Sequence, residues 1–196
     1  MSAPLPPLVA GLVGPIGAGK DTAAAYLQEH YVFTAIAFAD PVRDMLGALI
    51  GHVGVGGEWL TERALKEHPM PVIGRSYRQL ARSLGGQWGR AHVRHDLWVR
   101  IAAHQAEQAL ARGENVLLTD VRHLNEARWL RSLGGQLVAI QRDGCEFAIA
   151  EHDSEAEASL LECEHSVTNH STAAHLYDQL DLVVERLRTP TAGADA

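Results

Sequence analysis

The chain has 196 residues, of which 46% are hydrophobic and 21% charged, with a formal net charge of −7. This composition excludes a disordered or fibrous protein, and the negative balance argues against binding nucleic acid through overall charge. No uncharged apolar run reaches the ~18 residues that span a bilayer. The two cysteines are too few for a disulfide framework or a four-cysteine zinc site. We therefore expect a single-domain protein of the cytoplasm, or of the host cytoplasm if the protein is viral, with no membrane partner.

Charge is unevenly distributed along the chain. Residues 63–100 contain eight basic side chains and two acidic ones, whereas residues 151–185 contain nine carboxylates and neither lysine nor arginine. Of the 17 basic residues, 15 are arginines, whose planar guanidinium suits bidentate recognition of phosphate or carboxylate. The basic segment therefore predicts a pocket for a small anion.

Short apolar runs alternate with longer helix-prone stretches. Buried strands are predicted over residues 8–13, 32–38, 115–119, 136–140 and 164–168. Helices are predicted over residues 20–30, 41–51, 58–67, 76–84, 97–112, 125–133 and 176–187, with Asp40 as the N-cap before Pro41. This alternation predicts an α/β fold, a five-stranded parallel sheet flanked by helices.

A glycine-rich segment, Gly14-Pro-Ile-Gly-Ala-Gly-Lys20-Asp-Thr22, lies between the first strand and the first helix. It matches the P-loop pattern GxxxxGK, in which glycines let several backbone N–H groups converge on phosphates. Lys20 would reach the β- and γ-phosphates of a nucleotide at the helix N-terminus. Asp21 replaces the usual Ser or Thr ligand of Mg²⁺ and would hold the metal directly or through water. Thr22 would offer a hydroxyl to a phosphate.

Two further groups of polar residues follow the third and second strands. Asp120 comes directly after the third strand, where a metal-associated carboxylate belongs, and Arg122 is placed to contact a phosphate in the same crevice. Asp40 and Arg43 fall on the first turn of the helix after the second strand, which suits a second phosphorylated ligand. The absence of an NKxD motif and of GxGxxG after the first strand disfavours a signalling GTPase and a dinucleotide-binding fold.

Several segments resemble the bacteriophage deoxynucleoside monophosphate kinases, a branch of the P-loop kinases. In chain order they are GKDT, FADPVRDML, SYRQLARSLGGQWGR, DLWVRI, LLTDVRHLNEA, His152-Asp-Ser-Glu155 and Val167-Thr-Asn169. The family transfers the γ-phosphate of ATP to a deoxynucleoside 5′-monophosphate with Mg²⁺. The resemblance therefore implies a kinase fold with the strand order of nucleoside monophosphate kinases, and a small nucleotide substrate.

The resemblance also implies roles for individual residues. ATP and Mg²⁺ would be bound by Gly17, Ala18, Gly19, Lys20, Asp21 and Thr22, with Asn169 near the adenine and Asp21 and Asp120 at the metal. The monophosphate would be held by Arg43, Arg78 and Arg122, beside Asp40 and Gly85, with Trp98 and Phe38 against the base. Asp120 and Glu126 would lie near the sugar or the metal. Arg142 would begin the lid and, with Lys20, Asp120 and Arg122, form the catalytic group.

The same resemblance implies how the single kinase domain is organised. Its core would comprise residues 7–39 and 113–188, its helical acceptor-binding region about 40–112, and its lid about 142–163. Two departures stand out: Gly86 and Gln87 replace the Thr and Glu of the family's LGTE block, and the segment after Arg142 is acidic where related kinases bring arginines.

Two alternatives stay open at this point. A kinase resembling dephospho-coenzyme A kinase would phosphorylate a hydroxyl and would need Asp40 as its base. An ATP-binding regulator without turnover would need only the P-loop. The sequence leaves open the base preference and the oligomeric state, a homodimer included.

Overall fold

The computed structural model describes residues 5–147 and 153–189, which divide into two compact units. The core unit comprises the residues up to Ala37 and from Ala103 onward, and the helical unit comprises Phe38–Ala102. The boundary between them falls within helix α5 (Leu97–Ala111). That the helical region binds the phosphate acceptor stays a prediction, and residues 148–152 of the predicted lid lie outside the described residues.

The core unit is built on a five-stranded parallel sheet in the order β2-β3-β1-β4-β5. Its strands are β1 (Val9–Val13), β2 (Phe33–Ile36), β3 (Asn115–Leu118), β4 (Gln136–Gln141) and β5 (His165–Thr168). All five residues of β1 are buried, because this central strand is covered on both faces and needs a continuous apolar run. The predicted α/β class, the five strands and the nucleoside monophosphate kinase order are thereby confirmed.

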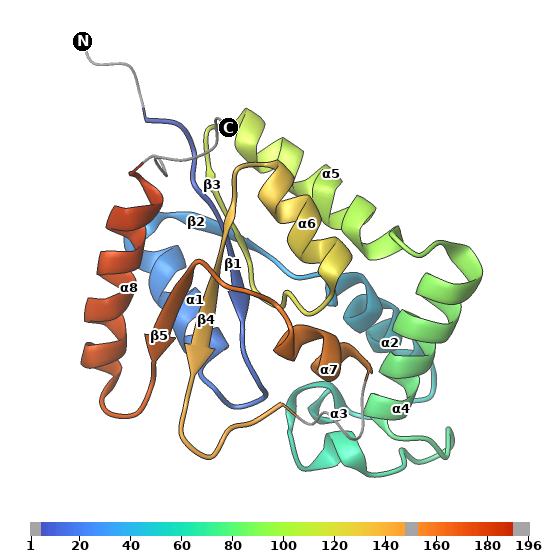
Figure 1. Cartoon of the computed structure of the whole chain (residues 1–196). Helices are drawn as coiled ribbons and strands as arrows, with labels where there is room; N and C mark the ends of the chain where they lie inside the picture. Colours follow the sequence, from blue (N-terminus) through green and yellow to red (C-terminus); the bar gives the residue numbers. More distant parts are fainter. Residues whose placement is uncertain (1–4, 148–152, 190–196) are drawn as a thin grey trace. The chain divides into compact units, whose positions relative to one another are not determined.

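Helices cover both faces of this sheet (Figure 1). On one face, α1 (Lys20–Tyr31) and α8 (Ala173–Leu187) share a buried cluster with the strands, to which they contribute Leu27, Leu176 and Leu180. On the other face lies α6 (Leu124–Ser132), whose Leu130 packs over Gly11 of β1. A Cβ at Gly11 would lie 2.5 Å from Leu130 Cδ1, so glycine allows this helix to approach the sheet closely.

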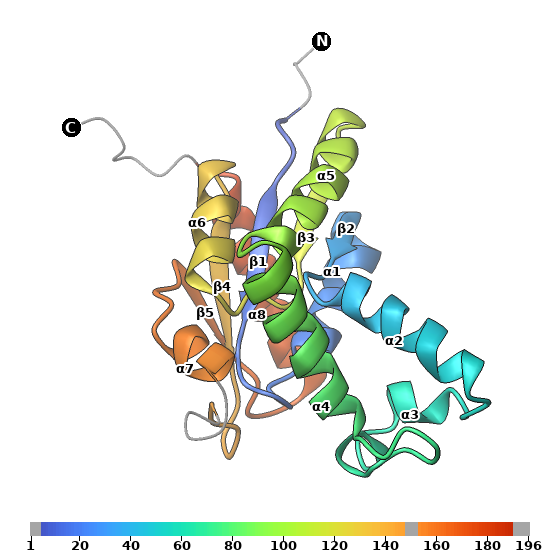
Figure 2. The ribbon, with the colours of Figure 1, turned by 90° about the vertical axis from the view of Figure 1, so that its right-hand side faces the viewer.

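A short helix that the sequence did not predict, α7 (Asp153–Ser159), lies beneath α6 in both views (Figures 1 and 2). Glu157 joins the two helices: its Oε1 accepts the Leu124 N–H at 2.8 Å, and its Oε2 lies 2.6 Å from His123 Nδ1. Ala158 of α7 is also buried. Seven residues are too few to hold a helix by local propensity, so α7 depends on these tertiary contacts.

The helical unit contains α2 (Asp40–His52), α3 (Glu58–Thr61), η1 (Leu65–Glu67), α4 (Tyr77–Arg82), η2 (Ser83–Val93) and the first residues of α5. The single helix predicted over residues 58–67 is wrong: the chain is extended at Glu62, and none of the four residues of α3 is buried, so no apolar face sustains it. The predicted N-cap is also wrong. Ala39 occupies that position, and Asp40 is already inside α2, where it pairs with Arg43.

The longest unpredicted element is η2, an 11-residue π-helix that continues α4. Its glycines lower its helical propensity, but one of them, Gly89, makes room for a large neighbour, the indole of Trp98. The Trp98 Nε1 donates to the Gly85 carbonyl at 2.8 Å, and the ring lies directly against Gly89. The π-helix therefore depends on tertiary packing around one tryptophan, which a periodicity argument cannot detect.

Replacing Gly89 with alanine should destabilise the protein by about 1–3 kcal/mol, because the new methyl group would collide with the Trp98 ring. Gly86 is the matched control in the same helix: a Cβ there meets nothing within 4 Å, so G86A should be neutral or stabilising by up to about 1 kcal/mol. Urea denaturation of the two variants measures both effects. Equal free energies of unfolding for G89A and the wild type would contradict this packing.

Candidate active site

The glycine-rich loop leads from the end of β1 at Val13 to the start of α1 at Lys20. Gly17 and Gly19 adopt positive φ angles of 87° and 106°, a region that residues with a Cβ rarely enter. Gly14 is constrained by space instead, since a Cβ there would lie 2.5 Å from the Ile140 carbonyl oxygen of β4. The backbone is thus shaped as the P-loop pattern predicts, with its N–H groups at a helix N-terminus.

Asn169 braces this loop from the end of β5. Its Nδ2 donates to the Ala18 carbonyl at 2.9 Å, and its backbone N–H donates to the Gln141 carbonyl at 2.7 Å. The same amide packs directly against Gly19, so that a Cβ on Gly19 would collide with it. Asn169 therefore stabilises the loop through these contacts. A position near the adenine stays a prediction.

Lys20, the first residue of α1, turns back over its own loop. Its Nζ donates to the Gly14 carbonyl at 2.7 Å and to the Pro15 carbonyl at 3.0 Å. Burial lowers the pKa of the ammonium below its ordinary value, and repulsion from Arg122 lowers it further; the carboxylates of Asp21, Glu155 and Asp120 oppose the shift. The core unit therefore brings Lys20, Arg122 and three carboxylates into one electrostatic neighbourhood.

The loop after β3 presents Asp120 and Arg122 and is held by a buried glutamate. Glu126 is 1% exposed, and its Oε2 accepts the backbone N–H groups of Arg122 at 2.8 Å and of His123 at 3.0 Å. This is the capping box of α6, in which the carboxylate satisfies N–H groups at the helix start. The capping role differs from the predicted contact of Glu126 with the sugar or the metal. What it fixes is the backbone that carries Arg122.

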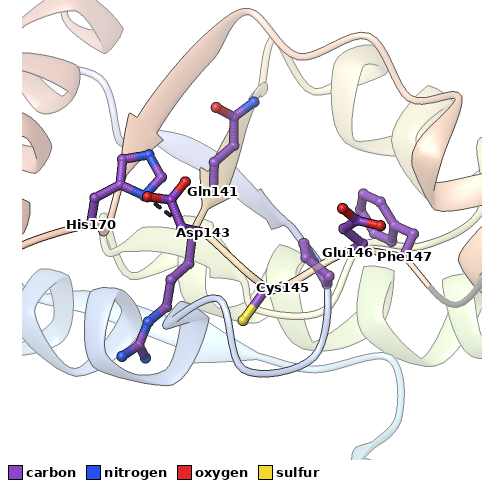
Figure 3. Close-up of a pocket in the computed structure, with 8 residues that line it drawn as sticks. Gln141, Asp143, Cys145, Glu146, Phe147 and His170 are labelled. Atoms are coloured by element: carbon purple, nitrogen blue, oxygen red, sulfur yellow. Dashed lines mark hydrogen bonds and ion pairs between the residues drawn. The ribbon is translucent and has the colours of Figure 1, made fainter.

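A surface pocket of about 460 Å³ lies beside the loop, where β4 ends (Figure 3). It is lined by Pro15, Gln141, Arg142, Asp143, Cys145, Glu146, Phe147 and His170. His170 closes one side: its Nδ1 accepts the Asp143 N–H at 3.1 Å, and Figure 3 shows the two side chains facing one another. Arg142 is exposed and reaches the Gly17 carbonyl with its Nη1 at 3.5 Å. The volume is in the range of small-ligand sites.

The donor groups near Lys20 fit Mg²⁺ rather than a metal held by protein alone. Asp21 lies on the first turn of α1 and Asp120 follows β3. Both carboxylates raise the pKa of Lys20, so their charges interact with its ammonium. Among residues 5–147 and 153–189, no three His, Cys, Asp or Glu side chains are grouped to hold a metal. Mg²⁺ at phosphate sites takes one or two carboxylates and completes its shell with phosphate oxygens and water. Thr22, also predicted in this site, is exposed on the first turn of α1.

The helical unit has a pocket of its own, with a volume of about 560 Å³. It is lined by Arg43, Asp44, Gly47, Leu60, Thr61 and Lys66. Arg43 was predicted as a phosphate ligand and is half-exposed, with its Nη2 at 2.8 Å from Asp40 Oδ1. Lys66 was missed by the sequence analysis; it lies 5.3 Å from the centre of the Tyr77 ring. A second predicted phosphate ligand of this unit, Arg78, forms an ion pair with Glu67.

Two residues predicted to lie against the acceptor base, Trp98 and Phe38, are buried, and Gly85, predicted beside the monophosphate, contacts Trp98. Trp98 is 3% exposed, with its Nε1 bound to the Gly85 carbonyl and its ring against Gly89, so the structure leaves no open face for a base to stack on. Phe38 is 4% exposed. Gly85 serves as the acceptor for Trp98 and faces Val42 of α2. The distinction between a core indole and a base-stacking one depends on tertiary burial, which spacing on a helix does not reveal.

The core unit also contains a buried carboxylate that the sequence analysis did not place in the site. Glu155 of α7 is 3% exposed, and its Oε1 lies 3.0 Å from Arg122 Nη1. Its only sequence signal was its position in the segment His152–Glu155, which resembles the kinase family. A buried charge of this kind requires a partner, and here the partner is a predicted phosphate ligand.

Comparisons with known proteins agree with this geometry. The family of deoxynucleotide monophosphate kinases matches residues 72–180, more than half of the chain. A protein of Acanthamoeba polyphaga mimivirus described as "Putative deoxynucleotide monophosphate kinase" is 28% identical over 186 residues, covering 87% of this chain and 92% of its own. Bacteriophage origin stays a prediction from resemblance.

Solved structures share the fold at low sequence identity. A sugar kinase from Janibacter sp. HTCC2649 has a TM-score of 0.52 at 12% identity, covering 92% of this chain and 95% of its own. The Thermus thermophilus protein TT1252 has a TM-score of 0.50 at 17% identity, with coverages of 92% and 98%. In the part of the chain that the structure describes, no helix is long and apolar enough to cross a membrane. The fold is that of a P-loop kinase, and the chain belongs to the deoxynucleotide monophosphate kinase family.

Proposed function

We propose that this kinase transfers the γ-phosphate of ATP to a deoxynucleoside 5′-monophosphate. The observation that carries the proposal is Lys20, whose ammonium is held by two carbonyls of a glycine loop at the N-terminus of α1. This arrangement is suited to binding the β- and γ-phosphates of a nucleoside triphosphate. Family membership supports a deoxynucleotide as the acceptor.

The pocket at the end of β4 is our candidate for the base of ATP. It adjoins the loop through Pro15 and reaches the β5–α8 connection through His170. Phe147 and Cys145 give it an apolar part, and Arg142 and Gln141 supply polar groups that could orient a base or a phosphate. A triphosphate held on the loop would have its base within this neighbourhood.

Mg²⁺ would be held by Asp21 and Asp120 and would neutralise part of the phosphate charge during transfer. Lys20 would bind the β- and γ-phosphates of ATP, and Arg122 would contact the γ-phosphoryl group as it is transferred. The acceptor is a phosphate oxygen that is already ionised, since the second pKa of a phosphomonoester is about 6. No protein carboxylate has to act as a base, so Asp40, which is paired with Arg43, has no such role in this reaction.

The step itself is an in-line displacement at the γ-phosphorus. An oxygen of the acceptor's 5′-phosphate forms a bond to that phosphorus as the bond to the bridging β–γ oxygen breaks, giving ADP and the deoxynucleoside diphosphate. Positioning and charge neutralisation supply most of the rate. On the helical unit, the pocket with Arg43 and Lys66 offers two cations for the acceptor's phosphate dianion.

Arg142 should act on the transferring phosphoryl group. Replacing it with alanine should lower kcat by about several hundred-fold, because an arginine that stabilises such a group is worth roughly 10³-fold or more. Its side chain is exposed and makes a long contact of 3.5 Å to Gly17, so the variant should keep its stability. Steady-state kinetics and thermal denaturation measure the two quantities. An unchanged kcat would remove Arg142 from the catalytic group.

The proposed function is tested by ADP release with ATP and Mg²⁺ in the presence of dAMP, dGMP, dCMP or dTMP, with ribonucleotides as controls. Stimulation by one or more deoxynucleotides is expected. ADP release that no monophosphate stimulates would refute the proposed acceptor class.

A further inference from the structure

We propose that Glu155 is a positioning residue that holds the Arg122 guanidinium beside Lys20; the inference rests on the proposed function and deepens it. Three polar or charged residues are buried in the part of the chain that the structure describes: Ser76, Glu126 and Glu155. Ser76 caps α4 and Glu126 caps α6. Glu155 forms an ion pair with the side chain of Arg122.

The geometry of this ion pair leaves Arg122 able to bind an anion. Glu155 Oε1 takes one of the terminal nitrogens, Nη1, at 3.0 Å, whereas a guanidinium has five N–H donors on three nitrogens. The Arg122 side chain is 35% exposed although Glu155 is 3% exposed. The arginine is therefore held from its buried side, and its other N–H groups lie outside this ion pair.

Electrostatics explain why a carboxylate is needed at this point. Lys20 and Arg122 repel one another, and this repulsion contributes to the lowered pKa of Lys20. The negative charge of Glu155 raises that pKa. Two cations that both serve a phosphate site must remain close before the phosphate arrives. A buried anion behind one of them offsets that repulsion and fixes the direction of the guanidinium.

The backbone and the side chain of Arg122 are held by two different elements. Glu126 of α6 binds the Arg122 backbone N–H, and Glu155 of α7 binds the guanidinium. Glu157, two residues along α7, docks the same helix on Leu124 and His123. Glu157 therefore provides a matched control: a glutamine there can still accept the Leu124 N–H, so Glu157→Gln removes a charge from α7 while α7 stays docked and the partner of Arg122 stays in place.

The test compares Glu155→Gln with Glu157→Gln by steady-state kinetics on the full chain, each alone and combined with Arg122→Ala. Glu155→Gln should lower kcat by about 30-fold, as expected for a misplaced catalytic group, and should not raise KM for either nucleotide more than about twofold. Glu157→Gln should leave kcat within about threefold of the wild type. In the Arg122→Ala background, Glu155→Gln should have no further effect on kcat, since positioning acts only through the arginine.

Two results would overturn the assignment: an unchanged kcat in Glu155→Gln, or a loss of the same size whether or not Arg122 is present. A second readout needs no turnover: the affinity for ATP with Mg²⁺ can be measured by calorimetry. The same four proteins are compared, namely the wild type, Glu155→Gln, Arg122→Ala and the double variant. A loss of that affinity greater than about twofold in Glu155→Gln, and of the same size in both backgrounds, would refute action through Arg122 even if the chain phosphorylated no monophosphate. A wild type that binds ATP but shows no acceptor-stimulated turnover would refute the proposed function alone.

Discussion

Replacing Lys20 with alanine should lower kcat by about three orders of magnitude, the largest loss expected of any single substitution in this chain. The ammonium donates directly to the loop carbonyls of Gly14 and Pro15. An alanine there keeps the backbone N–H groups but loses the charge that would stabilise the leaving and transferring phosphates. Steady-state kinetics at saturating ATP measure the effect.

The same substitution should not lower the melting temperature at neutral pH. Burial lowers the pKa of Lys20 in the folded chain, so the protonated side chain disfavours folding at pH values below its folded-state pKa. Removing the group removes that cost.

Lys66, the other lysine of the chain, is the kinetic control for Lys20→Ala. It lines the pocket of the helical unit, so Lys66→Ala should affect KM for the acceptor more than kcat. A kcat for Lys20→Ala within about tenfold of the wild type would contradict this role.

Replacing Gly19 with alanine should abolish measurable ATP binding at millimolar concentrations and destabilise the fold. Two costs add at this position. The φ angle of 106° is strained for any residue with a Cβ, at about 1–2 kcal/mol, and the new methyl group would collide with the Asn169 amide that braces Ala18. Because the loop backbone is itself the phosphate ligand, relieving either cost must move the N–H groups that bind ATP.

Two controls separate these costs. Gly113 has a φ of 76° with nothing within 4 Å of a Cβ, so Gly113→Ala measures the backbone cost alone and should leave ATP affinity unchanged. Asn169→Ala combined with Gly19→Ala removes the collision and should recover part of the lost stability. Calorimetric ATP binding and thermal denaturation of these variants give the comparison. ATP affinity in Gly19→Ala equal to that in Gly113→Ala would show that the loop tolerates a side chain.

The sheet could be predicted because its signal is local. The central strand β1 is a continuous apolar run, and the loop after it is marked by glycines at positions that require positive φ or close approach. The elements that were missed are held by distant residues instead. The π-helix η2 packs Gly89 against Trp98, and α7 docks through Glu157 on the start of α6. Neither partner can be identified from spacing along the chain.

In the candidate site, too, some residues could be predicted from a local sequence pattern and others could not. The loop residues from Gly14 to Lys20 were predictable, because a phosphate-binding backbone leaves a sequence pattern. The role of a carboxylate depends on its surroundings: Glu126 is a buried cap and Glu155 a buried ion-pair partner, and neither role can be identified from the sequence. Trp98 similarly reads as a base-stacking residue until its burial is known.

The most direct test of the proposed reaction is to identify its products. The purified chain would be incubated with ATP, Mg²⁺ and an equimolar mixture of the four deoxynucleoside monophosphates, and the nucleotides separated by chromatography. A deoxynucleoside diphosphate formed in the same amount as ADP is the expected result. ADP accompanied by inorganic phosphate, with no deoxynucleoside diphosphate, would contradict transfer to the monophosphate.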